Sequence, residues 1–308
     1  MSAQRKKQKA AKGFLLESLG DWLHHAEKLY AKHTVALGQV ATSAHDEALY
    51  LLLHTLGLPL DSKPAVLRRK LKPEETARVE EIFRRRLEEH VPAAYLTREA
   101  WLGEHRFFVD ERVIIPRSYF LEIIPEQLPQ WLPVKKPVKR VVDVCTGSGC
   151  LAVLLAHQFP DAKVDAIELS PDAMVVAKFN LASHGLGKRV KLFHSDVFDA
   201  VPRAKYDIIL SNPPYVPTRE LRDLPAEFKN EPQMALDGGR DGLDIIRKLL
   251  RQSADRLQPH GIVVLEVGGL RTAMDRAFPE LDLHWLHTDD GEDCVCVVQA
   301  ARLKKWRG

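Results

Sequence analysis

From Lys139 onward, short apolar runs alternate with helical segments, and this alternation restricts the fold more than any other feature of the chain. Continuous runs of β-branched and other apolar residues are typical of strands buried on both faces. We expect strands at 141–144, 164–168, 190–193, 206–211 and 261–267, with helices at 151–159, 171–184 and 243–257. This pattern predicts a doubly wound α/β fold with a mostly parallel sheet. Two further strands, 281–286 and 294–300, have little chain between them, which predicts a terminal antiparallel hairpin and a seven-stranded sheet.

The chain before Lys139 predicts two further regions. Residues 1–98 are expected to form a small helical domain, because apolar positions recur at helical spacing in 14–37 and 46–56 and because Pro73 is followed by two glutamates. Its basic tail (Arg5, Lys6, Lys7, Lys9, Lys12) predicts disorder or, alternatively, an arm that contacts phosphates. Residues 99–137 are expected to form a β-hairpin, turning at Asp110-Glu111 between 105–109 and 112–115, and a proline-rich linker. Residues 138–308 form the predicted ligand-binding domain.

Composition sets broad limits. With 308 residues, 45% hydrophobic and 28% charged, the chain is long enough for two globular domains. The net charge of +3 permits an RNA-rich or ribosomal partner without requiring one. Cys145, Cys150, Cys294 and Cys296 lack zinc-ligand spacing, so we expect free thiols in a reducing cytoplasm and no metal. No membrane segment is expected, because the most apolar helical stretch, 48–60, is short.

The segment Asn212-Pro213-Pro214-Tyr215 directly follows the strand expected at 206–211. In open α/β sheets, ligands bind at the carboxyl ends of strands. Neither proline has an N–H group, and the residue before each proline is biased toward extended geometry. Asn212 Oδ1 and the Pro213 carbonyl can therefore accept from a planar group with two N–H donors, such as an amide or a base amine, and Tyr215 offers a ring face. An ordinary proline-rich turn is the alternative at this point.

Three more segments follow strands at the same expected edge. The loop Asp143-Val144-Cys145-Thr146-Gly147-Ser148-Gly149 has two glycines that allow close approach and precedes a helix N-terminus that favours an anion. Because a third glycine is missing, the carboxylate of a methionine moiety fits better than a pyrophosphate. Glu168 can accept both ribose hydroxyls of an adenosine, and Asp196 can accept from the adenine amine, with Val197 or Phe198 against the ring. Each feature alone has a plain alternative (a tight turn, a solvated acid, a helix cap), whereas the ordered set is a strong signal.

Together these motifs resemble a known family. Asn212-Pro213-Pro214-Tyr215 and Asp143-x-Cys-Thr-Gly-Ser-Gly, with Val113-Ile114-Ile115-Pro116-Arg117 and the run from Glu231 to Leu243, are similar to the S-adenosylmethionine-dependent protein-glutamine N5-methyltransferases of the HemK/PrmC and PrmB type. The resemblance implies a Rossmann-like class I methyltransferase fold and methyl transfer to a glutamine side-chain amide. It implies that S-adenosylmethionine is bound by Asp143, Cys145, Thr146, Gly147, Ser148, Gly149, Glu168, Asp196, Val197 and Asn212. It implies catalytic roles for Asn212, Pro213, Pro214 and Tyr215, and substrate contacts by Asn212, Pro213, Tyr215 and Arg117.

The segment after Arg117 separates two branches of this family. Release-factor methyltransferases follow Ile-Pro-Arg with Pro-Glu-Thr-Glu, whereas Ser118-Tyr119-Phe120 follows here, similar to the Pro-Arg-Ser form of the PrmB branch. That branch modifies ribosomal protein L-three, so the resemblance implies L-three as the substrate, with release factors as the alternative and the N-terminal helices as a recognition domain. Adenine-N6 nucleic-acid methyltransferases use the same acceptors, but they usually need a basic surface. A catalytically silent scaffold is least expected, because the run 212–215 is intact.

Overall fold

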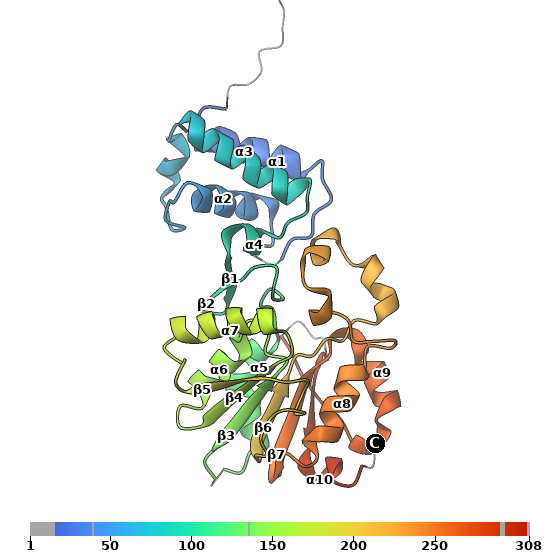
Figure 1. The fold of residues 1–308 in the computed structure, drawn as a ribbon. Coiled ribbons are helices and arrows are strands. Elements are labelled where there is room, and N and C mark those ends of the chain that lie inside the picture. The colour runs from blue at the N-terminus through green and yellow to red at the C-terminus, as the bar shows by residue number, and fades with distance from the viewer. Residues whose placement is uncertain (1–15, 39, 135, 290–292, 307–308) are drawn as a thin grey trace, which may run out of the picture. The chain divides into compact units, whose positions relative to one another are not determined.

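The computed structural model describes residues 16–38, 40–134, 136–289 and 293–306. The chain divides into two compact units, Met1–Thr97 and Arg98–Gly308 (Figure 1). The predicted basic tail, from Arg5 to Lys12, lies outside the described residues. None of the helices within these described ranges combines the length and the apolar character that a membrane crossing requires.

The N-terminal unit is helical, as predicted. It contains α1 (Leu19–Tyr30), α2 (Ala44–Thr55), α3 (Pro73–Leu87), α4 (Ala93–Thr97) and the 3-10 turn η1 (Pro64–Arg68). The predicted helix 14–37 is shorter at both ends, and its start is set by a capping box in which the Ser18 hydroxyl accepts from the Asp21 N–H and the Asp21 carboxylate accepts from the Ser18 N–H. Inside the unit, Glu47 accepts hydrogen bonds from Arg86 Nε at 2.6 Å and from the Tyr30 hydroxyl at 2.7 Å.

The C-terminal unit begins with an antiparallel hairpin of β1 (Glu99–Leu102) and β2 (His105–Phe108). The prediction that the hairpin turns at Asp110-Glu111 is wrong, because residues 112–115 form no strand and the turn lies at 103–104. Gly103 takes the positive φ of 59° that this tight turn requires. The Asp110 carboxylate instead accepts from the backbone N–H and the guanidinium of Arg112, which closes a local turn.

The second sheet has seven strands in the order β5-β4-β3-β6-β7-β9-β8. Its strands are β3 (Arg140–Val144), β4 (Lys163–Glu168), β5 (Val190–His194), β6 (Tyr206–Ser211), β7 (Leu257–Glu266), β8 (His284–Leu286) and β9 (Val295–Gln299). Strands β3 to β7 pair in parallel, while β9 pairs antiparallel with both β7 and β8. The predicted mostly parallel sheet with a terminal antiparallel hairpin is therefore confirmed.

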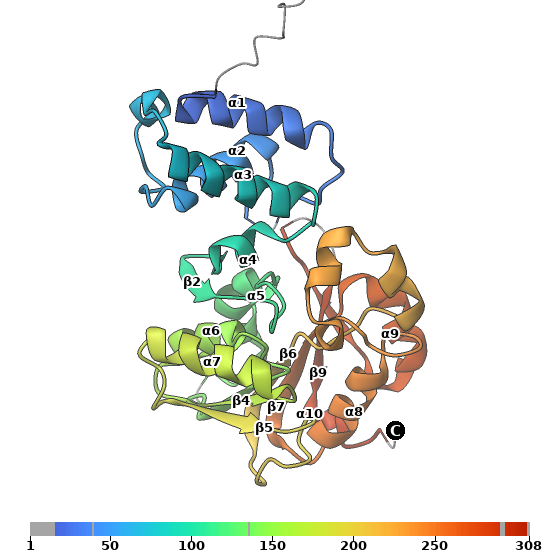
Figure 2. The ribbon, with the colours of Figure 1, turned by 45° about the horizontal axis from the view of Figure 1, so that its top comes forward.

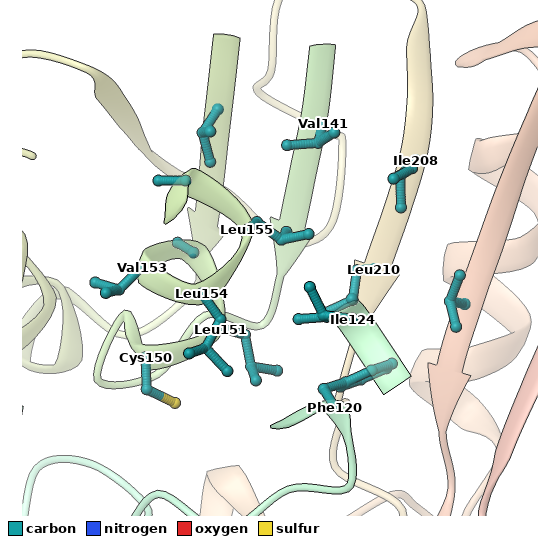
Figure 3. Packing of buried hydrophobic residues seen from close by; sticks show 14 of the residues in the cluster. Phe120, Ile124, Val141, Cys150, Leu151, Val153, Leu154, Leu155, Ile208 and Leu210 are labelled. Carbon is teal, nitrogen blue, oxygen red and sulfur yellow. The ribbon is translucent and has the colours of Figure 1, made fainter. Parts of the chain in front are cut away.

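Helices cover both faces of this sheet (Figures 1 and 2). One face carries α5 (Phe120–Glu126), α6 (Cys150–Gln158) and α7 (Pro171–Ser183); the other carries α8 (Asp244–Ser253), α9 (Arg271–Ala277) and α10 (Ala300–Leu303). Successive strand residues point to opposite faces, so Val141 joins the first apolar cluster while Val142 joins the second. Figure 3 shows part of the first cluster, which includes Val141 of β3, Ile208 of β6, and Leu151 and Leu155 of α6.

The strand register aligns the carboxyl ends that carry the predicted site. Val144 of β3 lies opposite Ser211 of β6, and Ser211 lies opposite Leu265 of β7. Because β3 is flanked by β4 on one side and by β6 on the other, the order of the strands reverses there, and ligands bind at such a switch point. The remaining 3-10 turns are η2 (Leu128–Trp131), η3 (Thr218–Asp223), η4 (Ala226–Asn230), η5 (Gln233–Ala235), η6 (Gly268–Leu270) and η7 (Pro279–Leu281).

Candidate active site

A cavity of about 1000 Å³ opens at the carboxyl edge of the sheet in the C-terminal unit. This volume is at the upper end of the usual range for small-molecule sites. The predicted residues that line it are Arg117, Cys145, Thr146, Gly147, Ser148, Glu168, Asp196, Val197, Asn212, Pro213, Pro214 and Tyr215. Asp143 and Gly149 do not line the cavity. The structure therefore brings the four predicted strand-end segments together in one place, with two of their residues set back from the wall.

The loop between β3 and α6 has a backbone shaped for close approach by a ligand. Cys145, Gly147 and Gly149 all have positive φ, at 62°, 54° and 82°. Gly149 is the N-cap of α6 and provides no side-chain cap, so the helix N-terminus keeps donors for an anionic group. Asp143 lies behind the loop, fully buried, and accepts from the Thr146 hydroxyl at 2.5 Å. Burial raises the pKa of Asp143 to about 7.

Glu168 and Asp196 are already held by protein contacts. Glu168 Oε2 accepts from the Gly147 N–H at 2.8 Å, while Oε1 accepts from the N–H groups of Leu169 and Ser170. A carboxylate has about four lone-pair directions, so these three bonds leave room for a hydroxyl donor. Asp196 Oδ2 lies 2.7 Å from Lys248 Nζ, a partner that the sequence did not indicate. Glu168 therefore braces the glycine loop in addition to bordering the cavity.

The turn after β6 presents Asn212 in one defined orientation. Its Nδ2 donates to Glu266 Oε1 at 2.9 Å, so Oδ1 faces away from this carboxylate. The preceding Ser211 hydroxyl donates to the Val144 carbonyl at 2.6 Å, which ties the turn to β3. Pro213 is buried. The pKa of the Tyr215 hydroxyl is raised to about 12, first because the ring is buried and second because Glu266 is negatively charged. The side chain of Tyr215 is therefore a neutral ring at the cavity wall.

The glycine-rich run from Gly238 to Gly242 supports this turn from behind. The Val216 N–H donates to the Leu236 carbonyl and the Gly238 N–H donates to the Val216 carbonyl, both at 2.9 Å. A Cβ at Gly238 would lie 2.7 Å from the Cα of Tyr215, and one at Gly242 would lie 2.3 Å from its carbonyl oxygen. Only glycine allows this approach, which explains why the run 231–243 accompanies the Asn-Pro-Pro-Tyr turn.

Arg117 lines the cavity but is bound to another element. Its Nη1 donates to Glu231 Oε1 at 2.9 Å, and its guanidinium lies 4.8 Å from the centre of the Phe228 ring. Burial raises the pKa of Glu231, and the charge of Arg117 opposes this shift. The sequence interpretation missed the roles of Glu231 and Glu266. Glu266 carries the signal that identified Glu168, a carboxylate at the carboxyl end of a strand.

Three histidines gather elsewhere in this unit. His105, His157 and His184 place nitrogen atoms within 4.8 Å of one another, on β2, on α6 and after α7. The rings of His105 and His157 stack with centres 4.9 Å apart, and none of the three lines the cavity. The cluster is thus separate from the site, and the absence of a metal from the chemistry stays a prediction.

Comparison with known proteins shows what the chain is similar to. The family model of the methyltransferase small domain matches residues 125–238. The solved hMettl16 catalytic domain has a related fold, with a TM-score of 0.50 and 14% identity over 82% of this chain and 91% of that one. The ribosomal protein uL3 glutamine methyltransferase of Burkholderia pseudomallei is 44% identical, covering 93% of this chain and 96% of its own length. Its namesake in Neisseria gonorrhoeae is 42% identical, over 94% and 96%. The predicted family is confirmed: the chain belongs to the ribosomal protein uL3 glutamine methyltransferases.

Proposed function

We propose that this protein transfers the methyl group of S-adenosylmethionine to the side-chain amide nitrogen of a glutamine in ribosomal protein uL3, the L-three of the sequence prediction. The observation that supports this most is the orientation of Asn212. Because its Nδ2 is bound to Glu266, its Oδ1 is left to pair with the Pro213 carbonyl as an acceptor for both protons of a primary amide. The names of relatives that cover almost the whole chain support uL3 as the protein that carries the glutamine.

The residues at the cavity fit the proposed cofactor. The open N-terminus of α6 and the loop 145–149 would hold the methionine carboxylate, since they offer backbone donors and little steric bulk. Glu168 has one lone-pair direction left and would accept from one ribose hydroxyl, and Asp196 would accept from the adenine amine, with Val197 beside the ring. When bound, S-adenosylmethionine supplies an electrophilic methyl group on a sulfonium. Asp143 does not line the cavity, so its contribution passes through Thr146.

The chemistry left to the protein is to position and to stabilise charge. A primary amide nitrogen is a poor nucleophile because its lone pair is delocalised into the carbonyl. Asn212 Oδ1 and the Pro213 carbonyl hold the amide so that its nitrogen faces the methyl group, and they stabilise the positive charge that builds on nitrogen. In-line positioning of two bound reactants contributes up to about 7–11 kcal/mol in well-oriented systems. Tyr215 packs against the plane of the substrate amide. After the methyl transfer, the substrate amide nitrogen loses one of its two protons to solvent and becomes neutral.

The test is a substitution that removes the acceptor without touching the cofactor loop. Asn212→Ala should lower kcat about 10²–10³-fold, the usual loss when a transition-state hydrogen-bonding group is removed. The dissociation constant for S-adenosylmethionine, measured by calorimetry, should stay within a few fold of the wild-type value. Unchanged turnover in this variant would remove Asn212 from the mechanism.

The protein substrate is tested separately, by labelled methyl transfer to uL3, release factors and DNA side by side. Transfer to uL3 alone supports the proposal. Transfer to release factors supports the alternative glutamine substrate, and transfer to DNA supports adenine-N6 chemistry. The four cysteines are free thiols, and a cytoplasmic location stays a prediction.

A further inference from the structure

Glu266 is the last residue of β7 and lies beside the Asn-Pro-Pro-Tyr turn. Since Leu265 pairs with Ser211, the last residue of β6, the next residues along the chain, Glu266 of β7 and Asn212 after β6, come side by side. Glu266 is only 4% exposed, yet it lines the cavity. Burying a carboxylate is costly unless donors surround it, so its contacts indicate what it is there to hold.

Among the described residues, three groups donate hydrogen bonds to this carboxylate. Oε2 accepts from the Ser118 hydroxyl at 2.5 Å and from the Tyr119 N–H at 3.1 Å, and Oε1 accepts from Asn212 Nδ2 at 2.9 Å. The segment after Arg117 thus occupies one oxygen, and Asn212 occupies the other. Ser118 is the residue that distinguishes the Pro-Arg-Ser form of this segment. Its hydroxyl and Asn212 Nδ2 donate to the two oxygens of the same carboxylate.

An ionised carboxylate accepts hydrogen bonds and donates none. It therefore distinguishes the two ends of the Asn212 amide, attracting Nδ2 and repelling Oδ1. Without it, the amide could turn over and present a donor where the substrate amide also has donors. We propose that Glu266 is a positioning residue that holds Asn212 with Oδ1 toward the substrate glutamine. This inference rests on the proposed function, since it names what orients the acceptor of that site.

The charge state of Glu266 decides whether it can do this. Three charged or titratable groups face Glu266: Arg117, Tyr215 on the turn and Cys150 at the start of α6. Glu231 and Cys294 contribute to the raised pKa of Tyr215. Burial raises the pKa of Glu266 to about 7, against the opposing effects of its three donors and Arg117. Above this pH it is ionised and holds Asn212; below it, a proton on Glu266 can donate to Oδ1 and release the orientation.

The test is Glu266→Gln, which keeps the shape and removes the charge. The Tyr119 N–H can only donate, so together with the Ser118 hydroxyl it should claim the oxygen of the new amide. The new NH₂ group then faces Asn212 and favours the inverted amide. We expect kcat for uL3 methylation to fall about 10²-fold, while KM and the dissociation constant for S-adenosylmethionine stay within about threefold. The fall of kcat below pH 7 in the wild type should disappear in the variant.

A matched control is Asp207→Asn at the opposite end of the neighbouring strand. Asp207 is also a buried carboxylate that accepts from backbone N–H groups, those of Lys139 and Arg140, but it does not line the cavity. Its substitution should change the melting temperature and leave kcat and the pH profile as in the wild type. Equal losses of kcat in the two variants, or a pH limb near 7 that survives in Glu266→Gln, would overturn the inference. A wild-type enzyme that is inactive on uL3 but active on release factors would instead contradict the proposed substrate, and the comparison would then be made on that protein.

Discussion

A methyl group added at Gly268 should disturb the site through Tyr215. Gly268 follows β7 closely and has a φ of +51°, in the left-handed region that favours glycine. A Cβ there would lie 2.6 Å from Tyr215 Cε2 and 3.0 Å from Cζ, closer than real Cβ atoms come to a ring. Gly268→Ala must therefore move the ring that faces the substrate amide in the proposed mechanism.

The magnitude follows from two costs. The left-handed backbone costs about 1–2 kcal/mol for a residue with a Cβ, and overpacking costs about 1–3 kcal/mol. We therefore expect Gly268→Ala to lower the free energy of unfolding by about 2–5 kcal/mol. At about 2–4 °C per kcal/mol for a domain of 150–250 residues, the melting temperature of the C-terminal unit should fall by about 4–20 °C. Turnover should fall at least tenfold, because Tyr215 is displaced.

The neighbouring glycine supplies the control. Gly269 has no positive φ, and a Cβ built on it meets no atom within 4 Å. Gly269→Ala should change the free energy of unfolding by no more than about 0.5 kcal/mol, as for other surface substitutions. Calorimetric melting and labelled methyl transfer on both variants check the pair. If Gly268→Ala melts and turns over like Gly269→Ala, the contact between Gly268 and Tyr215 has no consequence and the reasoning is refuted.

Two predictions concern buried charges. Glu47→Gln should lower the free energy of unfolding of the N-terminal unit by about 3–5 kcal/mol, because the buried Arg86 guanidinium keeps its charge while the Glu47 carboxylate, 2.6 Å from its Nε, loses its own; a loss under 1 kcal/mol in urea unfolding would contradict this. Asp143→Asn should become more stable relative to the wild type as pH rises from about 4 through 7. Since the pKa of Asp143 is raised to about 7 in the folded state, the wild type loses stability over this range, by up to about 1.4 kcal/mol per pH unit. Urea unfolding at pH 5 and pH 8 measures the difference, and an equal gap at both values would contradict the assignment.

Local patterns predicted the elements of the α/β unit well because each strand is a short apolar run closed by a polar turn. The strand expected at 206–211 is observed at Tyr206–Ser211, and the helix expected at 171–184 at Pro171–Ser183. The sequence pattern misplaces the hairpin because two alternating runs, 105–109 and 112–115, flank an acidic pair that also suits a turn. Gly103, which takes the positive φ of the real turn, was the better signal.

Some features of the site could likewise be predicted from single residues, and others depend on the fold. The stiff backbone of Asn212 to Tyr215 follows from the missing N–H groups of its prolines, and the bend at Gly147 follows from a missing Cβ; both are properties of the residues themselves. The loop motif predicts that Asp143 binds the cofactor, whereas Asp143 lies behind the cavity wall and accepts from the Thr146 hydroxyl. A motif indicates that a residue matters at its position but not which way its side chain points.

The chemical groups at these strand ends were therefore predictable from the chain: an amide and a proline carbonyl after β6, an acid at the end of β4 and a glycine loop after β3. The orientation of that amide was not. It depends on Glu266, which is 54 residues away from Asn212 and reaches it only because β6 and β7 pair in one register. It depends also on Ser118, 148 residues from Glu266. Contacts over such separations depend on which strands become neighbours in the sheet, and that is decided by packing across the whole sheet and not by the propensity of one segment.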